Sequence, residues 1–420
     1  MIVSQNTVNT ITLIKNNIIK IFARLYAYTL AWHCADKILV IESDDWGAIR
    51  TSTPEAYKWL KNNGYEMQKS RWSVDALESD DDLTALFDVI KNFKDSRDRP
   101  VCITANMIMA NPNFDAIRTD KFNKYYYEPV ALSLAKSPLR KSVTKLWRAG
   151  LAQRFFYPQF HAREHVRWWQ WLKALQNNSP EVLQTFDLNM CGVPLASSKE
   201  NQSFYAPLYL DDNALAKENI NLQEIINQGI ELFEAQFGFR SLSTVAPNVT
   251  WTDSAEIIWA DKGIRYIQGG FMQYLPKGND VKIVAHHLGE KSRRVGTYLV
   301  RNVTFEPDKS RNENYWTSSF KQIKRALSFN VPAIISSHRV NYVGGIDESN
   351  RKYGLAQLRK LLTAVQAEWP DVYFLSSPEL GYMIENNLQC VNQLEGKEAA
   401  VFPDVMSIKK RAKRLEAHHE

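Results

Sequence analysis

Apolar residues recur along the chain in short runs, and the first clear run is Ile38-Leu39-Val40-Ile41. It has the length and branched side chains of one buried strand. The run ends at two adjacent carboxylates, Asp44 and Asp45, and Gly47 allows a sharp turn soon after them. We therefore predict a buried strand, from Lys37 onward, that delivers two acidic side chains into a loop.

Beyond this strand, apolar runs alternate with stretches of helical spacing. Further strands are predicted at Pro100–Ile108, Phe156–Phe160, Arg240–Val245, Tyr266–Gln268, Pro332–Ser337 and Val372–Leu375, with two strand-like runs inside Val281–Arg301. Helices are predicted at Pro54–Asn62, Asp81–Phe93, Lys141–Gln153, His165–Leu175, Leu222–Phe237, Trp316–Ser328, Gly354–Glu368 and Pro378–Glu385. No long polar linker interrupts the alternation. It favours one α/β domain around a parallel sheet, most simply a β/α barrel.

The two ends of the chain differ from this pattern. Residues Thr10–Trp32 have the apolar spacing of an amphipathic helix with a basic polar face. Such a helix can lie on a membrane, but docking on its own domain is favoured, because helices gain most stability by burying an apolar face. We predict a docked helix in residues 1–36, a barrel over 37–390 and a basic tail over 391–420, where Lys409, Lys410, Arg411, Lys413 and Arg414 crowd together.

Composition narrows the class of protein. The chain has 420 residues, is 45% hydrophobic and 23% charged, and carries a net charge of +6, which suits a globular protein. We find no basic stripe interleaved with aromatics, so we expect no nucleic-acid partner. The four cysteines form no Cys-x-x-Cys pair, which suits a reducing compartment. With no signal peptide and no membrane-length apolar stretch in the sequence, we predict a cytoplasmic location.

A second group of polar residues follows the apolar stretch Phe155-Phe156-Tyr157. His161 and His165 lie four residues apart, and would share one face where the segment turns into a helix, a spacing that suits one metal ion. Arg240 and His338 also lie at predicted strand ends. In a barrel, residues at the carboxyl ends of the strands converge on one mouth, so we expect these groups to meet there.

These residues together resemble the motifs of the polysaccharide deacetylase family, metal-dependent carbohydrate esterases on an irregular, often seven-stranded, β/α barrel. The strand that ends in Asp44-Asp45 is similar to the first motif, and His161 with His165 to the second. Arg240, in Phe239-Arg240-Ser241, resembles the arginine-led motif, and His338 the motif with the acid histidine. Ala162 and Arg339 depart from the family pattern, which has a hydroxyl residue and an aspartate at these positions.

The resemblance implies a role for each residue. Asp44 would be the general base, held by Arg240, and His338 the general acid. Asp45, His161 and His165 would bind a divalent metal, most simply zinc, which three such ligands leave open to a water molecule. The expected activity is removal of acetyl groups from N-acetylated sugars of a polysaccharide or its precursor, with a carbohydrate as the substrate partner.

Two other functions remain open from the sequence. One is a glycoside hydrolase on a related barrel that uses Asp44 and Glu164 as its two carboxylates. The other is a catalytically idle barrel that binds a glycan. Trp46 and the group Trp168, Trp169 and Trp171 are candidates for sugar stacking, although helix packing is favoured for the last three. His286 and His287 are weaker candidates for metal ligands.

Overall fold

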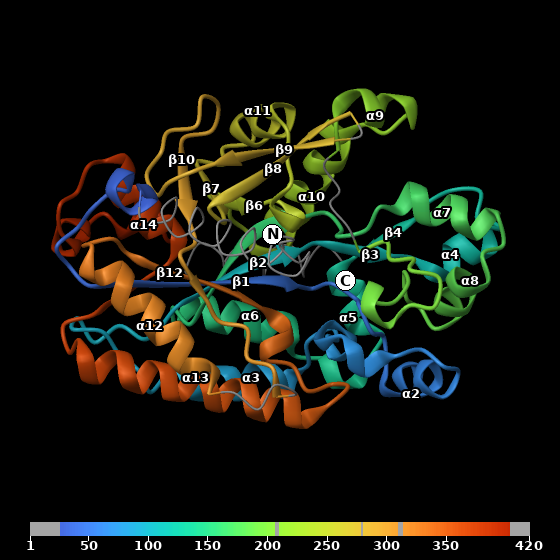
Figure 1. Ribbon diagram of the computed structural model, residues 1–420, viewed down its shortest axis with the longest axis horizontal. Coiled ribbons are helices and arrows are strands. Elements are labelled where there is room, and N and C mark those ends of the chain that lie inside the picture. The colour runs from blue at the N-terminus through green and yellow to red at the C-terminus, as the bar shows by residue number, and fades with distance from the viewer. Residues whose placement is uncertain (1–25, 206–209, 279, 310–313, 404–420) are drawn as a thin grey trace, which may run out of the picture.

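The computed structural model describes residues 26–205, 210–278, 280–309 and 314–403 (Figure 1). Its main sheet is parallel, and its strands run in the order β10, β7, β6, β5, β2, β1, β12 and β11. Their bounds are β1 Ile38–Trp46, β2 Ile103–Ile108, β5 Phe156–Ala162, β6 Ser243–Val245, β7 Tyr266–Gly269, β10 Thr297–Val300, β11 Val303–Thr304 and β12 Ala333–His338. A further strand, β13 (Tyr373–Leu375), pairs with the first residues of β1.

The sheet curls back on itself. The two ends of the strand order, β10 and β11, are neighbours in the chain and are separated only by Arg301 and Asn302. The N–H of Arg301 donates to the carbonyl of Gly269 at the end of β7, and the N–H of Asn302 donates to the carbonyl of Ile334 in β12. The prediction of a barrel-like β/α fold is confirmed, but the number seven is wrong. Eight strands form this path because Arg301 and Asn302 split the closing segment into two strands.

Helices cover the sheet on both sides. Figure 1 shows α3, α6, α12 and α13 below the strands and α10 and α11 above them. These helices span α3 Asp80–Ile90, α6 Val143–Ala152, α10 Leu222–Phe237, α11 Asp253–Asp261, α12 Tyr315–Ser328 and α13 Glu348–Glu368. The remaining helices are α2 Pro54–Asn62, α4 Phe114–Thr119, α5 Val130–Ala135, α7 Trp168–Gln176, α8 Pro180–Asp187, α9 Asp212–Lys217 and α14 Ser377–Glu385.

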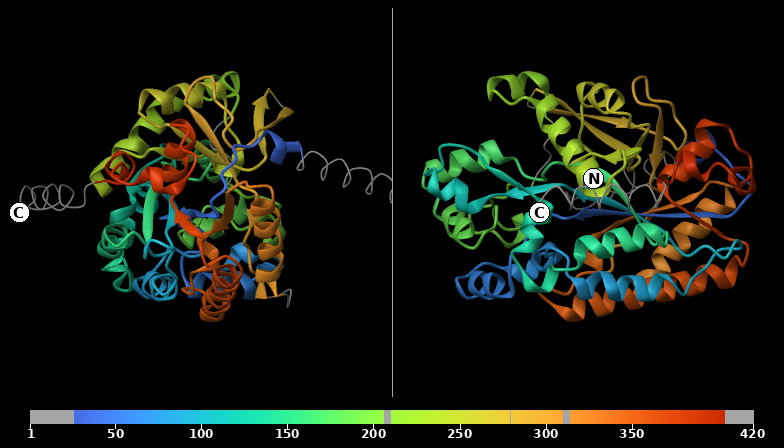
Figure 2. Two further views of the ribbon diagram at one scale, coloured as in Figure 1. Left: turned by 90° about the vertical axis from the view of Figure 1, so that its left-hand side faces the viewer. Right: turned by 180° about the vertical axis from the view of Figure 1, so that it is seen from behind.

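Strand β1 lies at the centre of the core. All nine of its residues are buried, and it pairs with β12 on one side and with β2 and β13 on the other. Burial on both faces explains why its first half is a continuous run of branched apolar residues without alternation. The end view in Figure 2 shows helices surrounding the strands. The polar second half of β1 therefore ends inside the molecule, where an unpaired charge would be costly.

Two smaller features stand outside the main sheet. Strands β3 (Ala110–Pro112) and β4 (Tyr127–Pro129) form an antiparallel pair, and α4, α7 and α8 pack around a separate apolar cluster that includes Trp171 and Phe186. Strands β8 (Met272–Lys277) and β9 (Asp280–Ala285) form an antiparallel hairpin. The sequence pattern predicted a strand at β9 but missed β8.

Most of the N-terminal helix predicted at Thr10–Trp32 lies outside the described residues. Of the part that is described, residues 26–30 are helical. Most of the basic tail lies outside them as well. Within the described ranges, no helix combines the length and the apolar character that a membrane crossing requires. The division into residues 1–36, 37–390 and 391–420 stays a prediction.

Candidate active site

The end of β1 carries two adjacent carboxylates that both line one cavity. In a regular strand, neighbouring side chains point to opposite faces. Here the register with β2 shifts between Ser43 and Trp46, and Asp45 has a left-handed φ of 72°. This bulge adds a residue to β1 and redirects the strand, so Asp44 and Asp45 face the same space. Asp45 holds this conformation without being a glycine, which is typical of a functional position.

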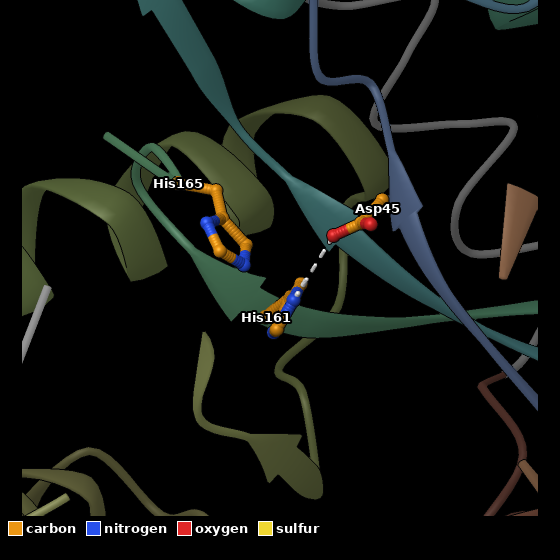
Figure 3. Close-up of side chains that lie close together, drawn as sticks. All are labelled: Asp45, His161 and His165. Atoms are coloured by element: carbon orange, nitrogen blue, oxygen red, sulfur yellow. Dashed lines mark ion pairs between the residues drawn. The ribbon is translucent and has the colours of Figure 1, made fainter. Parts of the chain in front are cut away.

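Asp45, His161 and His165 lie close together, as Figure 3 shows. One ligand atom from each of the three lies within 4.8 Å of the others, and all three residues are buried. His161 comes from the end of β5, whereas His165 lies in the connection before α7. The prediction that one helical face presents both histidines is therefore wrong. A strand end and the following loop bring them together, since α7 begins only at Trp168.

The donor atoms of these side chains suit a cation. His161 Nδ1 lies 2.6 Å from the carbonyl oxygen of Val245, so Nδ1 donates, and Nε2 lies 3.6 Å from Asp45 Oδ1. Burial lowers the pKa of His165 to about 3, which keeps it neutral, and its Nδ1 is buried without a hydrogen-bond partner. Two imidazoles and one carboxylate are a donor set that fits zinc-like divalent ions.

Arg50 binds Oδ2 of Asp45, the oxygen that does not face His161. Its Nη2 lies 3.0 Å from Asp45 Oδ2, and its Nε lies 3.2 Å from Asp75. Burial would raise the pKa of Asp45, but Arg50 and the neighbouring histidines lower it well below its usual value. Asp45 is therefore ionised, as a metal ligand must be.

Asp44 has different partners. The guanidinium of Arg301 binds both of its oxygens at 2.7 Å, and Asn106 donates to Oδ1 at 2.7 Å. Burial opposes ionisation, but Arg301 outweighs it and lowers the pKa of Asp44 to about 2. Arg301 also binds the buried Glu42. These contacts keep Asp44 ionised and fix its side chain. Asp44 lies beside the cluster of Asp45, His161 and His165 and is not part of it.

His338 lies opposite Asp44 in the ladder between β1 and β12, and its Nε2 is 3.8 Å from Asp44 Oδ2. Its Nδ1 is 2.5 Å from Glu306, which also pairs with Arg71 at 2.9 Å. Burial would lower the pKa of His338, but the Glu306 carboxylate raises it to about 9. His338 is therefore protonated at neutral pH, with Nε2 directed toward the cavity.

The structure does not bring Arg240 to this site. Its side chain is 62% exposed and pairs with Glu234 at the surface, and Arg301 occupies the place expected for it. Glu164 is buried against Arg163 and does not line the cavity. Asp44 and Glu164 are thus not a pair of facing carboxylates.

The tryptophans named from the sequence do not line the cavity either. Trp46 is fully buried between Phe156 and Tyr342, while Trp169 and Trp171 are buried as well. Trp72 does line it, with its ring edge-on to His338 at 4.9 Å between centroids. His287 is a lining residue, and His286 is buried against Gln273.

Several residues of the site were missed from the sequence. Arg301 ends the apolar run Tyr298-Leu299-Val300, the signal that identified His338, and Asn106 is a polar residue inside the predicted strand Pro100–Ile108. These two could have been found. Glu306 lies in a connection and Trp72 in the short 3-10 helix Arg71–Val74, and neither segment has a repeating apolar pattern, so no local signal marked them.

Arg339, which departs from the family pattern, has a structural role. It is fully buried and binds Asp75 at 3.0 Å and Glu78 at 2.9 Å. Glu78 in turn accepts from the N–H of Gly47 at the turn after β1. An aspartate at position 339 would face two buried carboxylates, so this chain requires the arginine.

Comparisons with known proteins found only distant similarity. No family model and no curated protein matches the chain. Among solved structures, 4-alpha-glucanotransferase from Thermococcus litoralis is 8% identical with a TM-score of 0.39; the match covers 83% of this chain and 40% of that one. A probable polysaccharide deacetylase from Pseudomonas aeruginosa is 9% identical with a TM-score of 0.41, covering 85% and 93%.

A branching enzyme from Pyrococcus horikoshii is 9% identical with a TM-score of 0.36, covering 82% of this chain and 69% of that one. This chain thus spans about two fifths of the glucanotransferase and most of the deacetylase. At these TM-scores and identities, the function has to be inferred from the side chains of the site.

Proposed function

We propose that this chain is a metal-dependent hydrolase that removes acetyl groups from N-acetylated sugars of a polysaccharide or its precursor. The observation that supports this most is the division of environment between two neighbouring carboxylates. Asp45 lies with His161 and His165, whereas Asp44 lies with Arg301 and faces the protonated His338. Hydrolysis of an amide needs a base for the attacking water and an acid for the departing nitrogen, and Asp44 and His338 can supply these two functions.

Asp45, His161 and His165 would hold the ion, for which zinc is the simplest choice. A divalent ion there would acidify a water molecule and polarise the acetyl carbonyl. Asp44 needs this help, because a carboxylate with a pKa of about 2 is too weak a base to deprotonate ordinary water. The side chains supply the rest. Asp44 accepts the proton of the attacking water, with Arg301 and Asn106 holding its oxygens in place.

His338 donates a proton to the nitrogen as the carbon–nitrogen bond breaks, which gives acetate and a free amine. Glu306 serves His338 in two ways. It fixes the ring through Nδ1, and it keeps the imidazole charged at neutral pH. Trp72 packs against the same ring in a T-shaped contact.

Acetate release from N-acetylated oligosaccharides tests the proposal. We expect Asp44→Asn to retain the ion but lose roughly a hundredfold or more of the rate, which is typical of removing a general base. Asp81→Asn, an exposed change on α3, is the control and should match the parent. An Asp44→Asn protein as fast as the parent would contradict the mechanism. Metal uptake without acetate from any of these proteins would favour an idle barrel.

A further inference from the structure

The β8–β9 hairpin has one apolar face that adjoins the cavity of the candidate site. Residues paired across an antiparallel ladder share a face. Met272 pairs with Ala285, Tyr274 with Ile283 and Pro276 with Val281, so these six side chains lie together, and we call them the hairpin strip. Met272 and Tyr274 line the same cavity as His161 and His338. The strip thus leads from the cavity outward.

The other face of the hairpin is attached to the body of the protein at Gln273. Gln273, which lies on that face, is buried; it donates to the carbonyl of Trp251 and contacts His286. The hairpin strip, in contrast, is left open. Ile283 is 57% exposed, Val281 54% and Met272 37%. Several adjacent exposed apolar side chains beside a catalytic cavity indicate a binding surface.

The cavity is larger than the catalytic centre needs. Its volume is about 910 Å³, which is in the upper range for ligand sites. Besides the catalytic groups, its lining includes apolar residues from separate segments of the chain, namely Tyr28, Ala31, Leu288, Val303 and Val331. A free sugar, which is covered with hydroxyl groups, would leave these residues and the hairpin strip unused.

From this continuity we propose that the substrate is an N-acetylated sugar carried on a lipid, whose hydrocarbon chain lies on the hairpin strip. The inference rests on the proposed deacetylase function and adds a substrate class to it. From position 272 to position 276 the strip is about 14 Å long, enough for a medium alkyl chain. Tyr274 is its one side chain with a hydrogen-bonding group, which favours hydrocarbon over peptide or glycan.

Alkyl β-glycosides of N-acetylglucosamine, methyl through octyl, test the inference. We expect kcat/KM to rise at least about thirtyfold from methyl to octyl, because each buried methylene contributes up to roughly fourfold. Val281→Thr and Ile283→Thr together should remove most of that rise and leave the methyl glycoside unchanged. Leu132→Ser with Leu139→Ser, changes at other exposed apolar residues, should leave the whole series unchanged.

Calorimetric binding of the octyl and methyl glycosides separates this inference from the proposed function. Tighter octyl binding that the two threonine substitutions abolish would support the strip even if no acetate were released. Acetate release with no dependence on chain length would overturn the inference and leave the function standing. A lower melting temperature or an altered molar mass of the threonine variant without glycoside would also overturn it, because this chain or a second copy would then cover the strip.

Discussion

At the scale of single residues, the site depends on how two adjacent carboxylates are kept different. They share a backbone and a cavity, yet one lies against two histidines and the other against an arginine. Opposite charge within hydrogen-bonding distance outweighs burial for both, and so both are ionised. The neighbouring side chains therefore set the two proposed roles, with Asp45 as a metal ligand and Asp44 as a proton acceptor.

The metal site leads to a direct prediction. His165→Ala should abolish binding of one equivalent of zinc, because it removes one of three donors from a buried group. Titration of zinc into the metal-free protein, followed by calorimetry, measures this. His287→Ala is the matched control, since His287 lines the same cavity outside the group of three. Full zinc binding by the His165 variant would show that the ligands are different.

The pair of His338 and Glu306 predicts a shift in the pH profile. A general acid works only while protonated, so activity should fall as pH rises through the pKa of His338, about 9. Glu306→Gln removes the anion that raises this pKa, and the alkaline limb should move to lower pH. The profile of kcat/KM between pH 6 and 10 checks the direction. An unchanged alkaline limb in the variant would remove His338 from this role.

At the scale of elements, the turn after β1 depends on a glycine. Gly47 has a φ of 86°, and a Cβ there would press against the carbonyl oxygen of Ile108. Gly47→Ala should destabilise the protein by about 2 kcal/mol or more, through strain in the left-handed region and this contact. Gly270→Ala, where a Cβ meets nothing within 4 Å, should change the free energy of unfolding little. Urea unfolding of both variants measures the difference.

The sequence predicted the elements that carry a repeating pattern. The apolar run before Asp44, the strand before His338 and the helix Leu222–Phe237 are all present, because burial of one strand or one helical face leaves a local signature. Features that depend on pairing across the fold could not be predicted. The bulge at Asp45 arises from its register with β2, and the hairpin strip becomes visible only once β8 pairs with β9.

The site followed the same rule. Side chains placed by a strand end, such as Asp44, Asp45, His161 and His338, were named from the sequence and meet in one cavity. Arg240 was named as a residue at a predicted strand end that resembles the arginine-led motif, but its side chain is exposed and pairs with Glu234. Arg301 follows an apolar run and could have been named in the same way, but its pairing with Asp44 depends on where the curled sheet closes, and no local pattern encodes that closure.

At the scale of the whole molecule, that closure and the site depend on one side chain. Arg301 lies between β10 and β11, where the two ends of the sheet meet, and it binds Glu42 and Asp44 on the central strand β1. The catalytic carboxylate is therefore part of the contact that joins the ends of the sheet to its middle. This arrangement links the stability of the fold to the charge of the site.

Arg301→Met tests that link. Without the guanidinium, two buried carboxylates lose their partner, which should lower the free energy of unfolding at pH 7 by about 3–5 kcal/mol. In the parent, Asp44 has a lowered pKa, so its stabilising contribution is present above its unfolded pKa and disappears as pH falls toward 2. In the variant, burial is opposed only by the remaining partners, such as Asn106 and His338, so the protonated carboxyls are more favoured than in the parent.

The difference between parent and variant should therefore be largest near neutral pH and shrink as pH falls toward 4. Urea unfolding at pH 7 and at pH 4 measures it. Arg240→Met is the matched control, because its pair with Glu234 is exposed and should contribute less than about 1 kcal/mol at either pH. Equal effects of the two substitutions, or a difference that does not change with pH, would show that Arg301 neither joins the ends of the sheet nor holds Asp44 ionised.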